Sequence, residues 1–406
     1  MLELQGYARE GPLRAFFSEP PFWFSPENGV VGIALSYDED LVREIEDSTY
    51  TSFSRGTVER SALVARSLAI ITGTSRFSGG PSVEPSLESI QYVVFERWRV
   101  SSYRRYERQV SPVVIEVTVG PNFPTEPIRF RDTPRSFPFL FFSDHRIVYR
   151  RIEHSVLHYA ESGGRITAQQ TRRWGTLGGF LENLDSQLFA TSAAHVLEGS
   201  TYAKGTPAFK GAEVQAVRSV LQKMPILGTL APRWGREVGE HYAVSPPEIV
   251  PRYQCSFDRN PQVPGLDVAL TKWPTPSMRM RRTVDLGAPG QVSQVLPSYF
   301  WGAASGLKHV YVSSLSIWHS YELPGTDQAA CVSNCLQIKL RDRPYFRTNV
   351  SRGGDSGAWL MADGLNGPVW LGLVVGGDGD RAGVVPASRI VSYFEPRLGP
   401  LQPRLS

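Results

Sequence analysis

The chain has 406 residues, which is long enough for two or three domains that each bury a sizeable core. Aromatic residues make up 11% and apolar residues 41% of the sequence, so a largely disordered chain is excluded. The net charge of +4 is small for this length and does not by itself indicate a polyanionic partner. The arginine pairs at 104–105 and 150–151 are too short, and too interleaved with acids, to predict nucleic-acid binding.

Residues 1–30 mix prolines with aromatic residues, most densely over 16–24. Such a segment is either an arm that docks a partner or an irregular stretch packed on its own domain, and we favour the second interpretation. Farther along, Val30–Tyr37 is typical of a strand, and 38–47 of one or two acidic helical turns. Apolar spacing predicts a helix over 61–72 and strands over 89–103, 112–120 and 146–152. Together they predict a mixed α+β N-terminal domain, residues 1–165, with no recognisable chemistry.

His154 and His158 are four residues apart and would share a helix face, with Glu161 one turn later. A zinc metalloprotease helix would need glutamate directly after the first histidine, where this chain has Ser155. We therefore predict neither a metal site nor a cofactor here.

From Arg172 onward, short apolar runs alternate with turn residues, and the 37 glycines and 31 prolines of the chain favour strands over long helices. This pattern is typical of a β-barrel. The stretch 210–250 predicts an insertion or enlarged loops, with a short helix at 214–221. Later strands are expected at 298–316, 332–340 and 359–375, and a closing helix at 385–394.

Only three cysteines occur, Cys255, Cys331 and Cys335, and this count points to a reducing compartment, because secreted proteins often carry several disulfides. The spacing of the last two could serve zinc, but no second pair or nearby histidine completes a site, so ordinary buried thiols are favoured. The first six residues show no secretory signal, and no run approaches the roughly 18 apolar residues of a membrane span. We expect a cytoplasmic protein that has no membrane contact.

The stretch 350–359 reads Val-Ser-Arg-Gly-Gly-Asp-Ser-Gly-Ala-Trp, with Ser356 in the run Gly-Asp-Ser-Gly. A nucleophilic serine needs a sharp backbone turn that exposes Oγ, and peptide N–H groups that converge on the negative oxygen of a tetrahedral intermediate. Glycine permits both. The alternative is an ordinary loop, because Asp-Ser-Gly is common in turns.

Two further stretches favour the catalytic interpretation. An apolar, strand-like run from 188 ends in Ala-Ala-His195, and Asp267 opens the short apolar run Asp-Val-Ala-Leu. The chain order is therefore His195, Asp267, Ser356. This order is that of the chymotrypsin triad and differs from the subtilisin and α/β-hydrolase orders.

With these motifs the sequence resembles the trypsin-like (chymotrypsin-fold) serine peptidases. The segments 193–195, 267–270 and 354–357 look like the histidine, aspartate and serine motifs of that family, and 175–181, 372–377 and 382–386 look like three of its strands. The resemblance covers roughly residues 172–406. It implies a mainly β domain, residues 166–406, of two six-stranded-type antiparallel β-barrels, with His195 and Asp267 from the first barrel and Ser356 from the second.

The resemblance also implies finer roles. The backbone N–H groups of Gly354 and Ser356 would form the oxyanion hole. Val350 would lie at the base of the substrate pocket, with Gly377 and Gly383 on its walls, which suggests an uncharged substrate side chain. Asp378 and Asp380 lie nearby and would overturn that expectation if they reached into the pocket.

Residues 163–166, Gly-Gly-Arg-Ile, resemble the activation cleavage site of the family, where a new isoleucine amine would pair with Asp355. Ile166 stands only 12 residues before Gly178, which is too few for the usual first strand, so a plain interdomain linker is favoured.

The sequence thus predicts a serine endopeptidase that acts on protein substrates, with an N-terminal domain that binds a regulatory protein or ligand or directs the enzyme. One alternative is a catalytically silent binding module, which would normally show a broken triad. The other is an esterase-like hydrolase, whose Gly-x-Ser-x-Gly elbow would need glycine where the chain has Ala358.

Overall fold

The computed structural model describes most of the chain in separate stretches. They are 11–18, 24, 28–52, 85–120, 123, 141–152, 156–157, 166–168, 175–198, 213–216, 236–251, 255, 265–273, 282–287, 297–322, 327–341, 349–364 and 367–405. The predicted helix at 61–72 and the residues His154, His158 and Glu161 lie outside these stretches.

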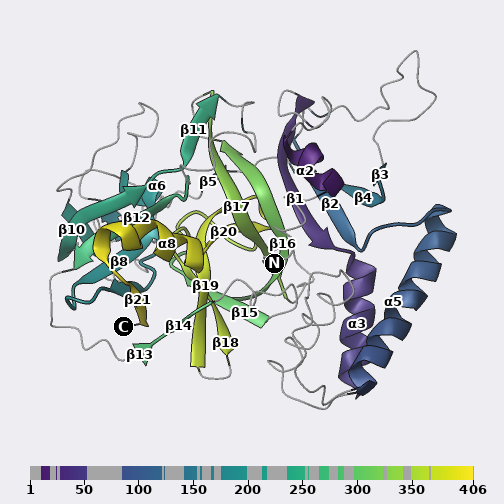
Figure 1. Ribbon diagram of the computed structural model, residues 1–406. Helices are drawn as coiled ribbons and strands as arrows, with labels where there is room; N and C mark the ends of the chain where they lie inside the picture. Colours follow the sequence, from purple (N-terminus) through teal and green to yellow (C-terminus); the bar gives the residue numbers. More distant parts are fainter. Residues whose placement is uncertain are drawn as a thin grey trace.

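Six antiparallel strands close into a barrel at the centre of the molecule (Figure 1). The ring runs β15–β16–β17–β20–β19–β18 and returns to β15. Its strands are β15 (Pro297–Gly302), β16 (Gly306–Glu322), β17 (Gln328–Leu340), β18 (Trp359–Gly364), β19 (Gly367–Gly377) and β20 (Ala382–Pro386). Short strands β11 (Glu248–Pro251), β14 (Asp285–Leu286) and β5 (Val156–Leu157) pair with β17, with β19, and with both β16 and β19. The expected strands at 298–316, 332–340 and 359–375 are confirmed.

An eight-stranded sheet lies on one side of the barrel, in the order β13-β21-β7-β8-β12-β10-β9-β6. Its strands are β6 (Ile166–Ala168), β7 (Phe180–Glu182), β8 (Leu188–Ala193), β9 (Glu213–Ala216), β10 (Arg236–Ser245), β12 (Val268–Trp273), β13 (Arg282–Thr283) and β21 (Gln402–Leu405). A mainly β chain with a closed six-stranded antiparallel barrel and a second sheet confirms the predicted chymotrypsin-like fold class. The helix predicted at 214–221 is wrong where it overlaps β9.

The closing helix α8 (Ala387–Leu398) follows β20 directly. It buries Ala387, Ile390, Val391 and Phe394, which are spaced to form one helical stripe. These side chains join a core shared by the second sheet and the barrel, where Trp359 also stacks on Trp370. The predicted closing helix is confirmed.

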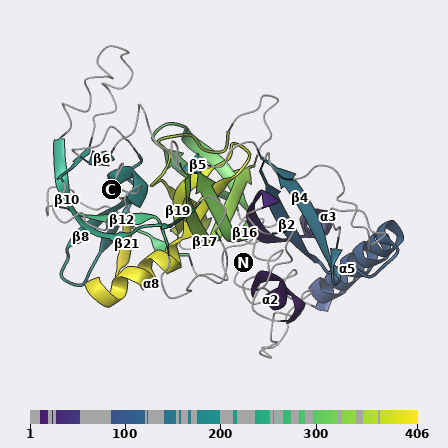
Figure 2. The same ribbon diagram turned by 90° about the horizontal axis from the view of Figure 1, so that it is seen from above.

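The N-terminal strands continue the barrel's own sheet. Antiparallel β1 (Val30–Tyr37) pairs with β16, β2 (Val113–Val119) pairs with β1, β4 (His145–Arg151) runs parallel to β2, and β3 (Phe141–Phe142) closes the edge. The two views agree that the barrel lies between these strands and the second sheet (Figures 1 and 2). One hydrophobic core contains Ile33 and Leu35 of β1 together with Leu315 and Ile317 of β16. The domain boundary near residue 165 stays a prediction, but the strands pair and pack across it.

Two helices, α3 (Glu39–Ser52) and α5 (Pro85–Tyr106), lie side by side beyond the N-terminal strands. The strand predicted over 89–103 is therefore wrong. Val94, Trp98 and Ser102 are buried at intervals of four, so this stretch presents a helical stripe, and Trp98 Nε1 donates to Asp38 Oδ1 at 3.2 Å. Its aromatic and β-branched residues misled the prediction, because they are enriched in strands.

The aromatic segment near the N-terminus packs on the same core. A short helix, α2 (Gly11–Ser18), buries Phe16 and Phe17, and Phe16 also contacts Phe24 and Phe142. The packed interpretation is confirmed for these residues, although part of the segment is helical and not irregular.

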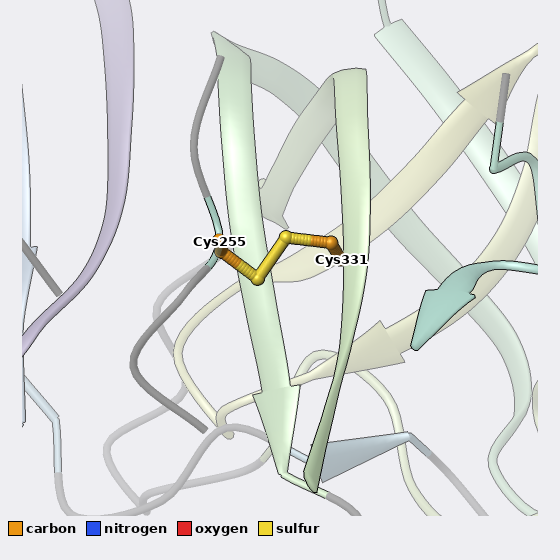
Figure 3. Close-up of a disulfide and its surroundings, with 2 residues drawn as sticks. All are labelled: Cys255 and Cys331. Atoms are coloured by element: carbon orange, nitrogen blue, oxygen red, sulfur yellow. A yellow bond between two sulfur atoms is a disulfide. The ribbon is translucent and has the colours of Figure 1, made fainter. Parts of the chain in front are cut away.

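Cys255 and Cys331 form a disulfide with a Cα–Cα distance of 5.7 Å (Figure 3). The expectation that Cys331 is an ordinary buried thiol is wrong. Strand β11, which ends four residues before Cys255, pairs with β17, the strand that carries Cys331. Cys335 stays a buried thiol whose pKa burial raises to about 12. Because disulfides persist in oxidising compartments, the cysteine count no longer supports a cytoplasmic location, which stays a prediction.

Among the described residues, no helix is both long and apolar enough to cross a membrane.

Candidate active site

Strand pairing brings His195 and Asp267 together. Strand β8 leads into a short helix, α6 (Ala194–Glu198), that carries His195, and Asp267 stands just before β12. Because β8 and β12 are antiparallel with Val268 opposite Ala193, the two side chains meet at the same end of the pair.

Asp267 contacts the histidine in two ways. Its Oδ2 lies 2.6 Å from His195 Nδ1, and its Oδ1 accepts the His195 backbone N–H at 3.0 Å. Asp267 has a φ of 56°, a left-handed conformation that aspartate tolerates better than most residues, and its carbonyl accepts the N–H of Ala194. An aspartate held this way fixes the orientation of the imidazole, and Nε2 is the ring nitrogen that Asp267 does not contact.

Ser356 lies in a tight loop between β17 and β18 of the barrel. Its Oγ donates to the carbonyl of Val375 on β19 at 2.8 Å, and its own carbonyl accepts the N–H of Thr176 at 2.8 Å. Gly357 has a φ of 97°, and a Cβ there would lie 2.2 Å from the Thr176 carbonyl oxygen. Only glycine therefore fits directly after the serine, and the chain makes the sharp turn that the motif predicted.

The serine loop is in van der Waals contact with the strand that leads to His195. A Cβ built on Gly357 would lie 2.6 Å from Ser192 Oγ and 3.2 Å from the backbone nitrogen of Ala193. His195, Asp267 and Ser356 have no exposed surface. The structure thus brings the three predicted residues to the junction between the second sheet and the barrel.

Two residues have supporting roles that the sequence did not predict. The Asp355 carboxylate accepts the backbone N–H groups of Arg352, Ala304 and Ser305 at 2.8, 3.1 and 2.9 Å, which ties the serine loop to the β15–β16 hairpin. Thr176 Oγ1 donates to the Gly354 carbonyl at 2.8 Å. Each of these polar residues directly follows a glycine, which was the available signal for both.

The predicted pocket residues also gather in one place. Val350 is buried, and its N–H donates to the Gly379 carbonyl at 2.8 Å. Gly377 and Gly383 lie on adjacent strands β19 and β20. A Cβ on Gly383 would lie 2.0 Å from the Tyr321 hydroxyl, so the tyrosine occupies the space beside this wall.

The polar side chains near these residues are either neutral or paired with an opposite charge. Burial raises the pKa of Tyr321 and lowers that of the neighbouring His319 to about 4, so both are neutral at neutral pH. Asp378 is paired with Arg150 at 2.8 Å. Asp378, which directly follows Gly377, therefore has its charge neutralised by a partner from the N-terminal strand β4.

The edge of β19 beside Ser356 carries a strand. In β5, Leu157 is opposite Gly376 and Val156 is opposite Gly377, in antiparallel register. The next residue of β19 toward the serine is Val375, whose carbonyl accepts the Ser356 hydroxyl. The backbone of β5 thus leads toward the serine.

Comparisons with known proteins add little. No protein-family model and no curated protein matches the chain. Among solved structures, a Nocardiopsis protease is 12% identical and covers 62% of this chain and 98% of its own, with a TM-score of 0.31. The NS6 protease of murine norovirus 1 is 12% identical and covers 57% and 89%, with a TM-score of 0.26. TM-scores this low do not establish a common fold, so the fold assignment rests on the strand pairing.

Proposed function

We propose that the chain is a serine endopeptidase. The observation that carries this proposal is the contact of 2.6 Å between His195 Nδ1 and Asp267 Oδ2. The Ser356 loop lies beside this pair, and its turn requires glycine at position 357. In this mechanism His195 Nε2 takes the proton of Ser356 Oγ, which attacks the substrate carbonyl carbon and forms a tetrahedral intermediate.

The intermediate collapses when His195 returns the proton to the leaving amine, and water then hydrolyses the acyl-enzyme by the same route. Asp267 holds the imidazole tautomer and stabilises the imidazolium. The N–H groups of Gly354 and Ser356 are the proposed oxyanion hole. Loss of such a donor typically lowers turnover about 100- to 1000-fold.

We propose an extended polypeptide as the substrate. The edge of β19 at Gly376 and Gly377 already accepts a strand of this chain, so it offers the backbone groups that bind a peptide by strand addition. A buried valine at position 350 and the pairing of Asp378 with Arg150 support an uncharged residue next to the scissile bond.

The same edge supplies a mode of regulation by the N-terminal part of the chain. While β5 pairs with Gly376 and Gly377, a substrate cannot use those backbone groups. Substitution Leu157→Pro removes a backbone N–H and disfavours strand pairing, so peptide turnover should rise. Leu157→Ala keeps the N–H and is the matched control. Equal rates for both variants would refute this mode of regulation.

The test of the main proposal is labelling with a fluorophosphonate probe, together with cleavage of a peptide library. Wild type should label and cleave after uncharged residues, whereas Ser356→Ala and His195→Ala should do neither. Ser101→Ala, an exposed serine on α5, is the control and should behave as wild type. A wild-type protein that neither labels nor cleaves would be a binding module, and one that hydrolyses only small esters would be an esterase.

A further inference from the structure

The loop of residues 378–381 joins the two strands that carry the predicted pocket walls. It is internally bonded: Asp378 N–H donates to the Arg381 carbonyl at 3.1 Å, and Asp378 Oδ1 accepts the Arg381 N–H at 3.0 Å. Through Gly379 it also accepts the N–H of Val350. Because Gly377 directly precedes this loop, the placement of the loop sets the position of the proposed peptide-binding edge and of the predicted pocket.

Two side chains from the N-terminal strands are bonded to this loop. Arg150 of β4 lies 2.8 Å from the Asp378 carboxylate, Nη2 to Oδ2. Glu116 of β2 accepts a bond from Arg381 Nη1, which also donates to Ser314 Oγ at 3.0 Å. None of the four charged side chains is more than 16% exposed, so these contacts are little screened by solvent.

The sheet fixes where these two side chains point. In the parallel pairing of β2 and β4, Thr118 is opposite Arg150, and Thr118 Oγ1 accepts from Arg150 Nη2 at 3.2 Å. Burial alone would raise the pKa of Asp378, but the Arg150 guanidinium brings it below its usual range. The carboxylate is therefore charged at neutral pH, and its bond to Arg150 is charge-assisted.

We propose that Arg150 and Glu116 are positioning residues for substrate binding: through Asp378 and Arg381 they fix loop 378–381, and with it the edge and pocket that hold the peptide. This inference rests on the proposed peptidase function. It makes residues of the N-terminal strands part of the substrate side of the active site, although none of them touches the reacting atoms.

The experiment uses the full chain with Arg150→Ala, the conservative variant Arg150→Lys, and Arg151→Ala, an exposed neighbour on the same strand, as the control. Arg150→Ala should raise the KM for a cleaved peptide about tenfold while kcat stays within about twofold. The rate of fluorophosphonate labelling of Ser356 should not change. Arg150→Lys should recover part of the loss, and Arg151→Ala should match wild type.

A second readout does not need catalysis. Amide hydrogen exchange over 376–383 should become faster in Arg150→Ala than in wild type or Arg151→Ala. An unchanged KM and unchanged exchange would overturn the inference, because the loop would then hold itself. Equal loss of labelling and cleavage would also overturn it, because the damage would have reached Ser356 and His195. If wild type itself neither labels nor cleaves, the proposed function fails, and exchange still shows whether Arg150 braces the loop.

Discussion

Replacing Arg381 with methionine should lower the denaturant concentration at which the chain unfolds. In Arg381→Met the carboxylate of Glu116 keeps its buried position without its main partner, and Ser314 and Gln337 lose a donor. The side chains of the pair are only 7% and 10% exposed. Breaking a buried pair from one side typically costs about 3–5 kcal/mol. Lys339 is also attracted to Glu116, so we expect the lower end, about 3 kcal/mol.

The assay is urea unfolding followed by tryptophan fluorescence. With a denaturant slope of about 3 kcal/mol per molar, a loss of about 3 kcal/mol lowers the midpoint by about 1 M. The double variant Glu116→Leu/Arg381→Met leaves no unpaired buried charge and should recover much of that loss. The control Arg105→Ala, which removes an exposed ion pair with Asp40, should leave the midpoint unchanged.

The stability that the Glu116–Arg381 pair contributes should also depend on pH in the acid range. Burial would raise the pKa of Glu116, but Arg381 lowers it below the ordinary value of 4.5. A depressed pKa gives stability that is present above the unfolded-state pKa and is lost as the pH falls through the folded-state pKa. The advantage of wild type over Glu116→Leu/Arg381→Met should therefore shrink below about pH 4.5. A midpoint for Arg381→Met equal to wild type, or a double variant less stable than the single one, would refute the reasoning.

Three further outcomes are expected. Asp267→Asn should lower kcat about 10,000-fold, because the amide no longer fixes the imidazole tautomer, while circular dichroism stays unchanged. Gly357→Ala should lose both probe labelling and thermal stability, because a Cβ would clash with a carbonyl oxygen 2.2 Å away; a variant as active and stable as wild type would contradict this. Reduction of the Cys255–Cys331 disulfide, which closes a loop across 76 residues, should cost about 4 kcal/mol in urea unfolding, whereas Cys335→Ala should not reproduce it.

The local parts of the site could be predicted from the sequence. An aspartate that opens one strand and a histidine that closes another meet if those strands are antiparallel neighbours, as β8 and β12 are. The glycines around Ser356 likewise report a turn that other residues cannot make. Both signals lie within a few residues of the group that they position.

The parts that could not be predicted depend on residues far apart in the chain. Glu116 and Arg381 are separated by 265 positions, and nothing in either local sequence indicates the other. The pairing of β1 with β16 and the Cys255–Cys331 disulfide are distant contacts of the same kind. The failed strand at 89–103 has a different origin, because its aromatic and β-branched residues are enriched in strands, whereas its length and its buried side chains at intervals of four are those of a helix.

The pairing of β1 with β16 leads to a last prediction, that residues 166–406 will not fold stably alone. Without β1, the β16 backbone from Leu315 to His319 loses its partner on that edge, and the core that it shares with Ile33 is opened. In the fragment, Leu315, Ile317 and Trp318 of β16 would return to water at about 1.5–3 kcal/mol each, or about 5–9 kcal/mol together. That loss is comparable to the whole stability of a typical domain, about 5–15 kcal/mol.

The measurement is soluble yield and near-ultraviolet circular dichroism of a fragment that begins at Ile166. We expect aggregation, because an unpaired apolar strand edge recruits other chains. Co-expression of residues 1–165 as a separate chain should restore solubility, since it resupplies β1. A soluble fragment with a cooperative melt would mean that the barrel closes its own core. The barrel would then fold without the N-terminal strands. In that case the bonds from Arg150 to loop 378–381 would not be needed for folding, and their role would be limited to substrate binding.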